Sequence, residues 1–198
     1  MCYLTLILCM AFAFVLGSIP FGLVIAKAVK GIDPRKAGSG NIGSTNVARL
    51  CGWPCGVLTL FCDIMKGTLP VLVAVHFMPD QFWQSLVALC AVLGHIKSPF
   101  LGFKGGKGVA TTIGALIPLA FLPLLCAVAC FFVVVFITRY VSLSSMTMAV
   151  ALVVFYALFG HWQLLPLGTV LAVMIIWAHR SNIGRLMRGE ESKFVLKK

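Results

Sequence analysis

Five long stretches without a charged residue constrain the fold of this chain more than any other feature. They run over residues 1–26, 67–79, 81–96, 108–138 and 140–179. A helix that crosses a lipid bilayer needs about 20 mostly apolar residues. Only 11% of the 198 residues are charged and 61% are hydrophobic, which excludes a soluble globular enzyme, a disordered tail and a nucleic-acid-binding domain. The sequence therefore predicts an all-α, multi-pass membrane protein.

The lengths of these stretches set the number of spans. The first stretch predicts one span, and the third predicts another when it is extended by a few residues at either end. The second extends backwards into a span interrupted only by Asp63 and Lys66. The last stretch has 40 residues and breaks at residues 160–163, so it predicts two spans. The fourth holds Pro118 and Pro123, and it fits either one tilted helix or two short helices with a turn between the prolines.

The distribution of basic residues decides between these two alternatives. Positively charged residues favour the cytoplasmic side of a membrane. Two spans in the fourth stretch place 15 of the 16 Lys and Arg residues on that side, with Lys66 inside a span, whereas a single span would move the basic tail outside. We therefore predict seven spans in one domain over residues 1–198, with the N-terminus outside and the C-terminus in the cytoplasm. We expect the first span to be retained rather than cleaved.

The first predicted cytoplasmic loop is rich in hydrogen-bond donors. Residues 38–49 read Gly-Ser-Gly-Asn-Ile-Gly-Ser-Thr-Asn-Val-Ala-Arg. The glycines allow backbone N–H groups to turn toward an anion, hydroxyl and amide groups add neutral donors, and the guanidinium of Arg49 matches a phosphate. The glycine spacing is that of a nucleotide-binding P-loop, but Ser44 stands where that motif requires lysine. We interpret the loop as a phosphate-binding segment, with a flexible linker as the alternative.

The second cytoplasmic loop combines lysines with glycines. It contains Lys-Gly-Gly-Lys-Gly at residues 104–108 and leads directly into a predicted helix from Val109. Two ammonium groups on a backbone that can approach closely, followed by a helix N-terminus, favour a bound anion. The alternative is a basic loop that faces anionic lipid. After the last span, His179 and Asn182 lie three residues apart on one helix face and on the same predicted side.

The second span carries a pair of opposite charges. Asp63 lies roughly 10 Å from the predicted start of that span, and Lys66 is three residues further on. Charges inside a membrane are costly, and they are usually paired or functional. We interpret the two residues as a structural ion pair at the floor of the cytoplasmic site, with a catalytic role as the alternative.

Several motifs of other enzyme classes are missing. No histidine is followed by aspartate five positions later, and no Gly-x-Ser-x-Gly elbow occurs. The eight cysteines form no pattern of paired metal ligands, so we expect no metal and no cofactor. Carboxylates on the cytoplasmic side are limited to Asp33, Glu190 and Glu191, which argues against paired-acid or magnesium-dependent chemistry. The predicted site can hold two phosphates against a membrane but supplies little acid–base power.

These motifs resemble a known family, the bacterial acyl-phosphate:glycerol-3-phosphate acyltransferases, over essentially the whole chain. The matching motifs are Gly-Ser-Ile-Pro-Phe-Gly at 17–22, Asp-x-x-Lys-Gly-x-x-Pro at 63–70, the first loop at every fixed position, Gly-His and Phe-Lys-Gly-Gly-Lys-Gly in the second loop, and His-Arg-x-Asn-Ile-x-Arg-Leu at 179–186. The resemblance implies transfer of an acyl group from acyl phosphate to the 1-hydroxyl of sn-glycerol 3-phosphate, which gives lysophosphatidate and phosphate. It also implies seven spans in the bacterial inner membrane, with the active site on the cytoplasmic face.

The resemblance also assigns roles to individual residues. It implies Ser39, Arg49 and His95 as catalytic residues. It implies that acyl phosphate is bound by Ser39, Gly40, Asn41, Gly43, Thr45 and Asn46, and glycerol 3-phosphate by Lys104, Gly105, Gly106, Lys107, Gly108, Ser142, His179 and Asn182. The expected partners are these two substrates and membrane lipid, with an acyl-phosphate synthase as a further candidate and no nucleic acid. The base that accepts the hydroxyl proton is left open between His95 and a phosphate oxygen of the substrate.

Two positions depart from the family pattern. Ser98 stands where family members usually have proline, and Pro99 follows it, so we expect the second loop to bend differently. Ser181 stands where many members have glutamate, so another residue must supply any pairing made by that carboxylate. An organic-phosphate or anion transporter is the alternative function, but the polar motifs gather on one predicted face and the sequence shows no repeat.

Overall fold

The structure, a computed structural model, describes residues 3–194 and contains no β-strand among them. The helical class predicted from the sequence is therefore confirmed. The chain divides into two compact units, Met1–Leu119 and Ala120–Lys198. The first two residues of the first predicted span, Cys2 among them, and Lys197 and Lys198 of the basic tail lie outside the described residues.

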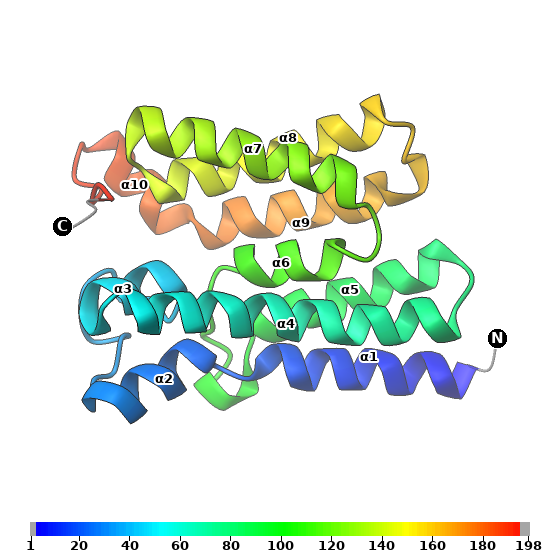
Figure 1. Cartoon of the computed structure of the whole chain (residues 1–198), viewed down its shortest axis with the longest axis horizontal. Coiled ribbons are helices and arrows are strands. Elements are labelled where there is room, and N and C mark those ends of the chain that lie inside the picture. Colours follow the sequence, from blue (N-terminus) through cyan, green and yellow to red (C-terminus); the bar gives the residue numbers. More distant parts are fainter. Residues whose placement is uncertain (1–2, 195–198) are drawn as a thin grey trace. The chain divides into compact units, whose positions relative to one another are not determined.

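The first unit is arranged around its longest helix, α4. Its elements are α1 (Tyr3–Ser18), α2 (Phe21–Lys30), α3 (Ser44–Cys51), α4 (Trp53–Phe77), α5 (Gln81–Ile96), a 3-10 turn at Pro99–Leu101 and α6 (Val109–Leu116). Helices α1 and α2 follow each other end to end beside α4, and α5 packs against both α1 and α4 (Figure 1). The short helices α3 and α6 also pack against α4.

Prolines and glycines set several helix ends in this unit. Pro20 has no N–H group to continue a helix, and it lies between α1 and α2. Gly31 ends α2 in the left-handed conformation, with φ at 66°. Gly108, with φ at 82°, precedes the first residue of α6, and Pro118 follows soon after its last. These two breaks limit α6 to eight residues.

Small residues let the helices of this unit approach closely. A β-carbon on Gly17 of α1 would collide with the backbone of Ala91 in α5. A β-carbon on Gly67 of α4 would likewise collide with the carbonyl oxygen of Thr111 in α6. Glycine at such contacts is common where helices associate inside a membrane, because backbone packing replaces the hydrophobic effect as the attraction. The glycines therefore fix α1 on α5 and α6 on α4.

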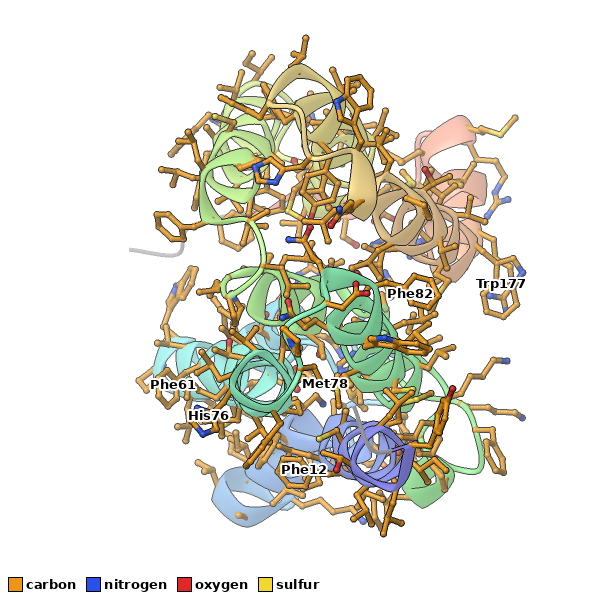
Figure 2. All side chains as sticks on the ribbon, turned by 90° about the vertical axis from the view of Figure 1, so that its right-hand side faces the viewer. Phe12, Phe61, His76, Met78, Phe82 and Trp177 are labelled. Atoms are coloured by element: carbon orange, nitrogen blue, oxygen red, sulfur yellow. The ribbon has the colours of Figure 1, made fainter. Side chains whose placement is uncertain are left out.

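Apolar side chains cover the outside of the helices as well as their interior. Met78 is fully buried in a cluster with side chains of α1, α4 and α5, whereas Phe12 and Phe61 are 48% and 60% exposed (all three are labelled in Figure 2). Lipid tails are as apolar as these side chains, so such a surface is stable in a bilayer. The distribution of apolar residues is that of an integral membrane protein.

The second unit is built from α7 (Phe121–Thr138), α8 (Val141–Leu158), a 3-10 turn at Trp162–Leu164, α9 (Leu165–Ala178) and α10 (Arg180–Met187). Helix α8 packs against both α7 and α9. Arg139, in the left-handed conformation with φ at 62°, ends α7 and begins the turn into α8. Helix α10 is bent by 58° from the axis of the segment that includes α9, and His179 lies at the bend.

Five helical segments within residues 3–194 are long and apolar enough to cross a membrane, or six if α9 and α10 form one bent span. Helix α5 coincides with the third charge-free stretch, and the candidate span that contains it runs on to Leu101, in line with the predicted extension. The break predicted at 160–163 is present. The fourth stretch does divide near Pro118, but its first part forms only α6, whose eight residues fall short of the roughly 20 that a span needs. Seven spans, and the orientation of the termini, therefore stay predictions.

Candidate active site

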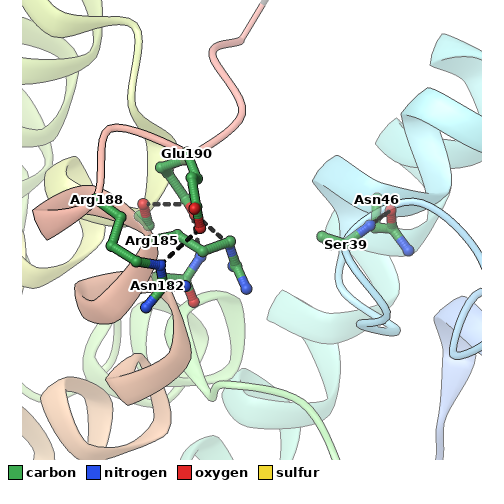
Figure 3. Close-up of polar contacts among 8 residues, drawn as sticks. Ser39, Asn46, Asn182, Arg185, Arg188 and Glu190 are labelled. Carbon is green, nitrogen blue, oxygen red and sulfur yellow. Dashed lines mark hydrogen bonds and ion pairs between the residues drawn. The ribbon is translucent and has the colours of Figure 1, made fainter.

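One side chain, that of Asn46 in α3, holds the first polar loop together. Asn46 is 2% exposed, and its Oδ1 accepts a hydrogen bond from the Ser39 backbone N–H at 2.8 Å (Figure 3). Its Nδ2 donates to the carbonyl oxygens of Pro34, Ala37 and Asn41 at 2.9, 3.1 and 2.8 Å. The amide predicted to bind acyl phosphate is therefore engaged in fixing the loop.

The junction between the loop and α3 leaves backbone donors without acceptors. Asn41 accepts a hydrogen bond from the Gly43 N–H at 2.8 Å, which closes a local turn. Gly43 is the residue before α3, and it has no side chain to accept from the first helical turn. Within the described part of the chain, the N–H groups of Ser44 and Thr45 donate to no acceptor. Such groups at a helix N-terminus are available to an anion.

The other residues predicted for acyl phosphate lie nearer the surface than Asn46. Ser39 and Gly40 are exposed, and Asn41, Gly43 and Thr45 are half-buried. Arg49 is exposed on α3, four residues after Thr45 and therefore on the same side of the helix. Because Asn46 binds the backbone of Ser39, the structure ties the loop carrying that serine to the helix carrying Arg49.

Backbone hydrogen bonds shape the second polar loop. The Gly105 N–H donates to the Ile96 carbonyl at 3.0 Å, and the Gly106 N–H donates to the His95 carbonyl at 3.1 Å. Gly108 precedes α6 and, like Gly43 before α3, provides no side chain to cap the helix. Both predicted phosphate-binding loops therefore lead through a glycine into an uncapped helix.

The two lysines of this loop differ in exposure, and the helix after it carries a further pair of polar groups. Lys104 is exposed and Lys107 is half-buried. Thr111 and Thr112, in the first turns of α6, are 0% and 1% exposed, and their hydroxyl groups have no hydrogen-bond partner among residues 3–194. Sequence reasoning missed these threonines, although two hydroxyl residues directly after a glycine-rich loop were a signal that could have found them.

His95 lies beneath the second loop rather than at its surface. It is 4% exposed, its Nδ1 lies 3.8 Å from Oδ1 of Asp63, and a β-carbon on Gly106 would collide with its Nε2. Asp63 pairs with Lys66 at 2.8 Å, and their side chains are 3% and 1% exposed. The ion pair expected from the sequence is present, and it adjoins the histidine that the resemblance marks as catalytic.

In the second unit, Glu191 gathers three polar side chains. Its Oε1 accepts hydrogen bonds from the hydroxyl of Ser142 at 2.7 Å and from Nδ2 of Asn182 at 2.6 Å, and its Oε2 pairs with Nε of Arg185 at 2.7 Å (Figure 3). The structure thus brings together Ser142 and Asn182, both predicted to bind glycerol 3-phosphate. Sequence reasoning missed Glu191 as a site residue and counted it only among the few cytoplasmic carboxylates.

The charge state of Glu191 follows from these contacts. Burial by itself would raise its pKa, but hydrogen bonds from Ser142, Asn182 and Arg185, together with the charge of Arg185, outweigh burial and lower the pKa below its ordinary value. The carboxylate is therefore ionised at neutral pH. His179 is 2% exposed, and its Nδ1 lies 2.8 Å from the Ile175 carbonyl oxygen, one helical turn earlier.

All five acidic residues of the chain are engaged in structural contacts. Their partners are Arg35 for Asp33, Lys66 for Asp63, the Phe82 N–H for Asp80, Arg188 for Glu190, and the three residues named above for Glu191. None of them is left as a free general base next to the two loops. No group of three or more His, Cys, Asp or Glu residues able to hold a metal ion occurs in residues 3–194.

The chain was compared with protein families and with individual proteins. The sequence model of a family described as glycerol-3-phosphate acyltransferase matches residues 7–189. The glycerol-3-phosphate acyltransferase of Nitratidesulfovibrio vulgaris is 54% identical over 186 residues, covering 93% of this chain and 57% of that protein. The protein of the same description from Desulfovibrio desulfuricans is 48% identical over 192 residues, covering 97% and 86%. The chain thus spans little more than half of the first relative and most of the second.

Solved structures agree with the sequence comparisons. The crystal structure of PlsY, an integral membrane glycerol 3-phosphate acyltransferase, in its glycerol 3-phosphate form has a TM-score of 0.92 and 41% identity, covering 96% of both chains. The lysophosphatidic acid form has a TM-score of 0.90 and 40% identity, covering 96% of this chain and 95% of that chain. A match over most of the sequence, and over nearly the whole fold, leads to one conclusion: the chain belongs to the glycerol-3-phosphate acyltransferase family.

Proposed function

We propose that the protein transfers an acyl group from acyl phosphate to the 1-hydroxyl of sn-glycerol 3-phosphate, on the cytoplasmic face of a bacterial inner membrane. One observation supports this proposal: the protein has two loops rich in hydrogen-bond donors, and all five of its acidic side chains are engaged in structural contacts. Such loops bind phosphates well, but they offer little acid–base chemistry. An acyl phosphate fits them, because it is a mixed anhydride and is already activated for transfer.

The first loop and α3 provide the groups proposed for acyl phosphate. The uncapped N–H groups of Ser44 and Thr45 and the exposed side chains of Ser39 and Arg49 can all donate to phosphate oxygens. Asn46 holds these elements in place before the substrate arrives, which lowers the entropy cost of binding. Donors in this loop also stabilise the oxyanion that forms on the carbonyl during the reaction.

The second loop provides the groups proposed for the phosphate of glycerol 3-phosphate. Lys104 and Lys107 supply positive charge, and the uncapped start of α6 supplies backbone N–H groups. The 1-hydroxyl oxygen attacks the carbonyl carbon, the bond from that carbon to the phosphate oxygen breaks, and phosphate leaves with the bonding electron pair. Holding the two reactants in this alignment can lower the barrier by about 7–11 kcal/mol at best.

A phosphate oxygen of the substrate is the proposed acceptor of the hydroxyl proton. His95, the other candidate, is 4% exposed, and its ring nitrogens face Asp63 and Gly106. A general base must lie within hydrogen-bond reach of the proton that it removes. The burial of His95 therefore supports a positioning role for it. Ser142, His179 and Asn182 remain predicted ligands of glycerol 3-phosphate.

The proposal is tested with the full chain purified in detergent and supplied with labelled glycerol 3-phosphate. We expect lysophosphatidate and free phosphate from palmitoyl phosphate but not from palmitoyl-CoA. The Ser39→Ala and Arg49→Ala variants should fold and lose turnover. Near-normal activity in both variants would remove these residues from the mechanism. Absence of product from either donor would favour the transporter alternative, which needs a sealed compartment to act.

The membrane arrangement is part of the same proposal. Seven spans require α6 to cross the bilayer as an unusually short segment, together with the residues that flank it. The test uses a variant that lacks the native cysteines and carries a single new cysteine, either at residue 80, in the turn predicted to lie outside, or at residue 36, in the first predicted cytoplasmic loop. In inverted membrane vesicles, a membrane-impermeant thiol reagent should reach these two positions from opposite sides. Labelling of both positions from the same side would contradict the predicted orientation.

A further inference from the structure

The first span is broken at the same point where two buried side chains from other segments meet it. Helix α1 ends at Ser18 and α2 begins at Phe21, so the carbonyl groups at this break lose their helical partners. The ammonium group of Lys66, in α4, donates to the Ile19 carbonyl at 2.7 Å. The hydroxyl of Ser98, after α5, donates to the Ser18 carbonyl at 2.6 Å. Two consecutive carbonyls are therefore held by donors from different parts of the unit.

Lys66 also links this break to the surroundings of His95. It pairs with Asp63 at 2.8 Å, and Asp63 Oδ1 lies 3.8 Å from Nδ1 of His95, which is a packing contact rather than a hydrogen bond. The Lys66 ammonium lies 5.7 Å from the ring centre of Phe21, within the range of a cation–π contact. All three ionisable side chains are at least 96% buried. A buried ion pair contributes little net stability compared with apolar packing, so its presence calls for another explanation.

The second loop is hydrogen-bonded to the backbone of residues 95–98. Their carbonyl groups accept the N–H groups of Phe103, Gly105 and Gly106 at 2.8 to 3.1 Å. The ring of His95 also lies so close to Gly106 that a β-carbon would collide with it. A shift of His95 or Ser98 therefore moves the backbone of the loop directly.

We propose that Asp63 and Lys66 are positioning residues. They keep His95, and with it the backbone of Gly105 and Gly106, at a fixed position relative to the helix break at Pro20. Ser98 provides the second point of attachment. The inference rests on the proposed function in one respect, that this loop binds the phosphate of glycerol 3-phosphate. The ion pair then acts on the affinity for glycerol 3-phosphate and not on the affinity for acyl phosphate.

The deciding variant is the double substitution Asp63→Asn with Lys66→Met. It removes both buried charges together, which avoids leaving one charge unpaired. It also removes the side-chain donor to the Ile19 carbonyl, which keeps the Phe21 N–H. We expect the variant to fold with a melting temperature close to that of a Thr59→Val control. Thr59 is a fully buried α4 residue that bonds only within its own helix, to the Cys55 carbonyl. The single Lys66→Met variant should melt lower, because Asp63 is then buried without a partner.

Two measurements are made on the detergent-purified full chain. Amide hydrogen exchange of the peptide covering residues 103–108 should become about tenfold faster in the double variant and stay unchanged in the Thr59→Val control. The KM for glycerol 3-phosphate should rise about tenfold, while the KM for acyl phosphate stays within about twofold. Unchanged exchange of this peptide in the folded double variant overturns the proposal, as does an equal rise in both KM values.

The outcomes separate this inference from the proposed function. Faster exchange in the variant, together with a wild type that makes no lysophosphatidate, would retain the positioning role and reject the function. Ser98→Ala provides a second test that changes no charge. We expect it to speed exchange of the same peptide about threefold, whereas Ser85→Ala, which loses only a bond within α5, should not. Equal exchange in these two serine variants would exclude the second point of attachment.

Discussion

Each of the two units contains one side chain that bonds to several other polar groups, and these two side chains differ in charge. Asn46 in the first unit is a neutral amide that is 2% exposed and joins four backbone groups. Glu191 in the second unit is a half-buried carboxylate that joins three side chains. An amide keeps its donors and acceptor at any pH, whereas a carboxylate loses acceptor capacity when it is protonated. The stability contributed by the Asn46 cluster should therefore not depend on pH, whereas the stability contributed by the Glu191 cluster should.

The largest effect is expected from removing the amide. Asn46→Leu keeps the branched shape but removes the amide that bonds one N–H and three carbonyls, of which only the Ala37 carbonyl keeps another donor among residues 3–194, the Gly40 N–H. The loss should destabilise the protein by about 2–4 kcal/mol. Asn46→Asp should be at least as harmful, because a carboxylate would then face three carbonyl oxygens. Thermal unfolding in detergent measures both variants. A control, Asn41→Ala, loses one side-chain bond and should cost about 1 kcal/mol. A melting temperature of Asn46→Leu equal to that of Asn41→Ala would contradict the role of Asn46.

A smaller effect is expected from neutralising the carboxylate. Glu191→Gln keeps the shape but weakens the bonds from Ser142 and Asn182 and removes the ion pair with Arg185. The Glu191 side chain is only 9% exposed, but glutamine keeps an acceptor oxygen for Ser142 and Asn182, so we expect a loss of about 1 kcal/mol. Activity should fall mainly through a higher KM for glycerol 3-phosphate, if Ser142 and Asn182 bind that substrate as predicted. An unchanged unfolding temperature and an unchanged KM together would show that the cluster has no role.

The dependence of stability on pH distinguishes the two clusters directly. The pKa of Glu191 is lowered in the folded protein, so its contribution is fully present above the ordinary value of 4.5 and is lost as the pH falls through the lower folded value. The stability difference between wild type and Glu191→Gln should therefore be constant from pH 7 to about 5 and shrink below that range. The difference between wild type and Asn46→Leu should show no such change. Unfolding temperatures measured from pH 7 to pH 3.5 would reveal either result.

The smallest effect is expected at the neighbouring carboxylate, which provides a matched control. Glu190 pairs with Arg188 at 2.7 Å, the same distance as Glu191 with Arg185, but both side chains of the Glu190 pair are more than half exposed. Glu190→Gln should therefore change stability by about 0.5 kcal/mol or less. The unfolding temperatures of Glu190→Gln and Glu191→Gln, measured side by side, test this difference. Equal losses in the two variants would mean that burial and the bonds to Ser142 and Asn182 contribute nothing.

Local sequence patterns predicted the parts of the structure that depend on neighbouring residues. The charge-free stretches predicted the helical membrane class, the span that contains α5, and the breaks near Pro118 and at residues 160–163. The glycine-rich motifs identified both polar loops and the family. Hydropathy, proline and glycine act through the chain within a few residues, so their consequences can be read without the fold.

Contacts between distant segments decided the rest. The bonds of Lys66 to Ile19 and of Ser98 to Ser18 join residues 47 and 80 positions apart, and no local pattern indicates them. The placement of His95 beneath Gly106 and the collection of Ser142 and Asn182 by Glu191 also required the tertiary structure. A sequence shows which residues can donate, accept or carry charge. Which buried group satisfies which other is decided only when the helices pack and water is excluded, because each polar group left inside then needs a partner.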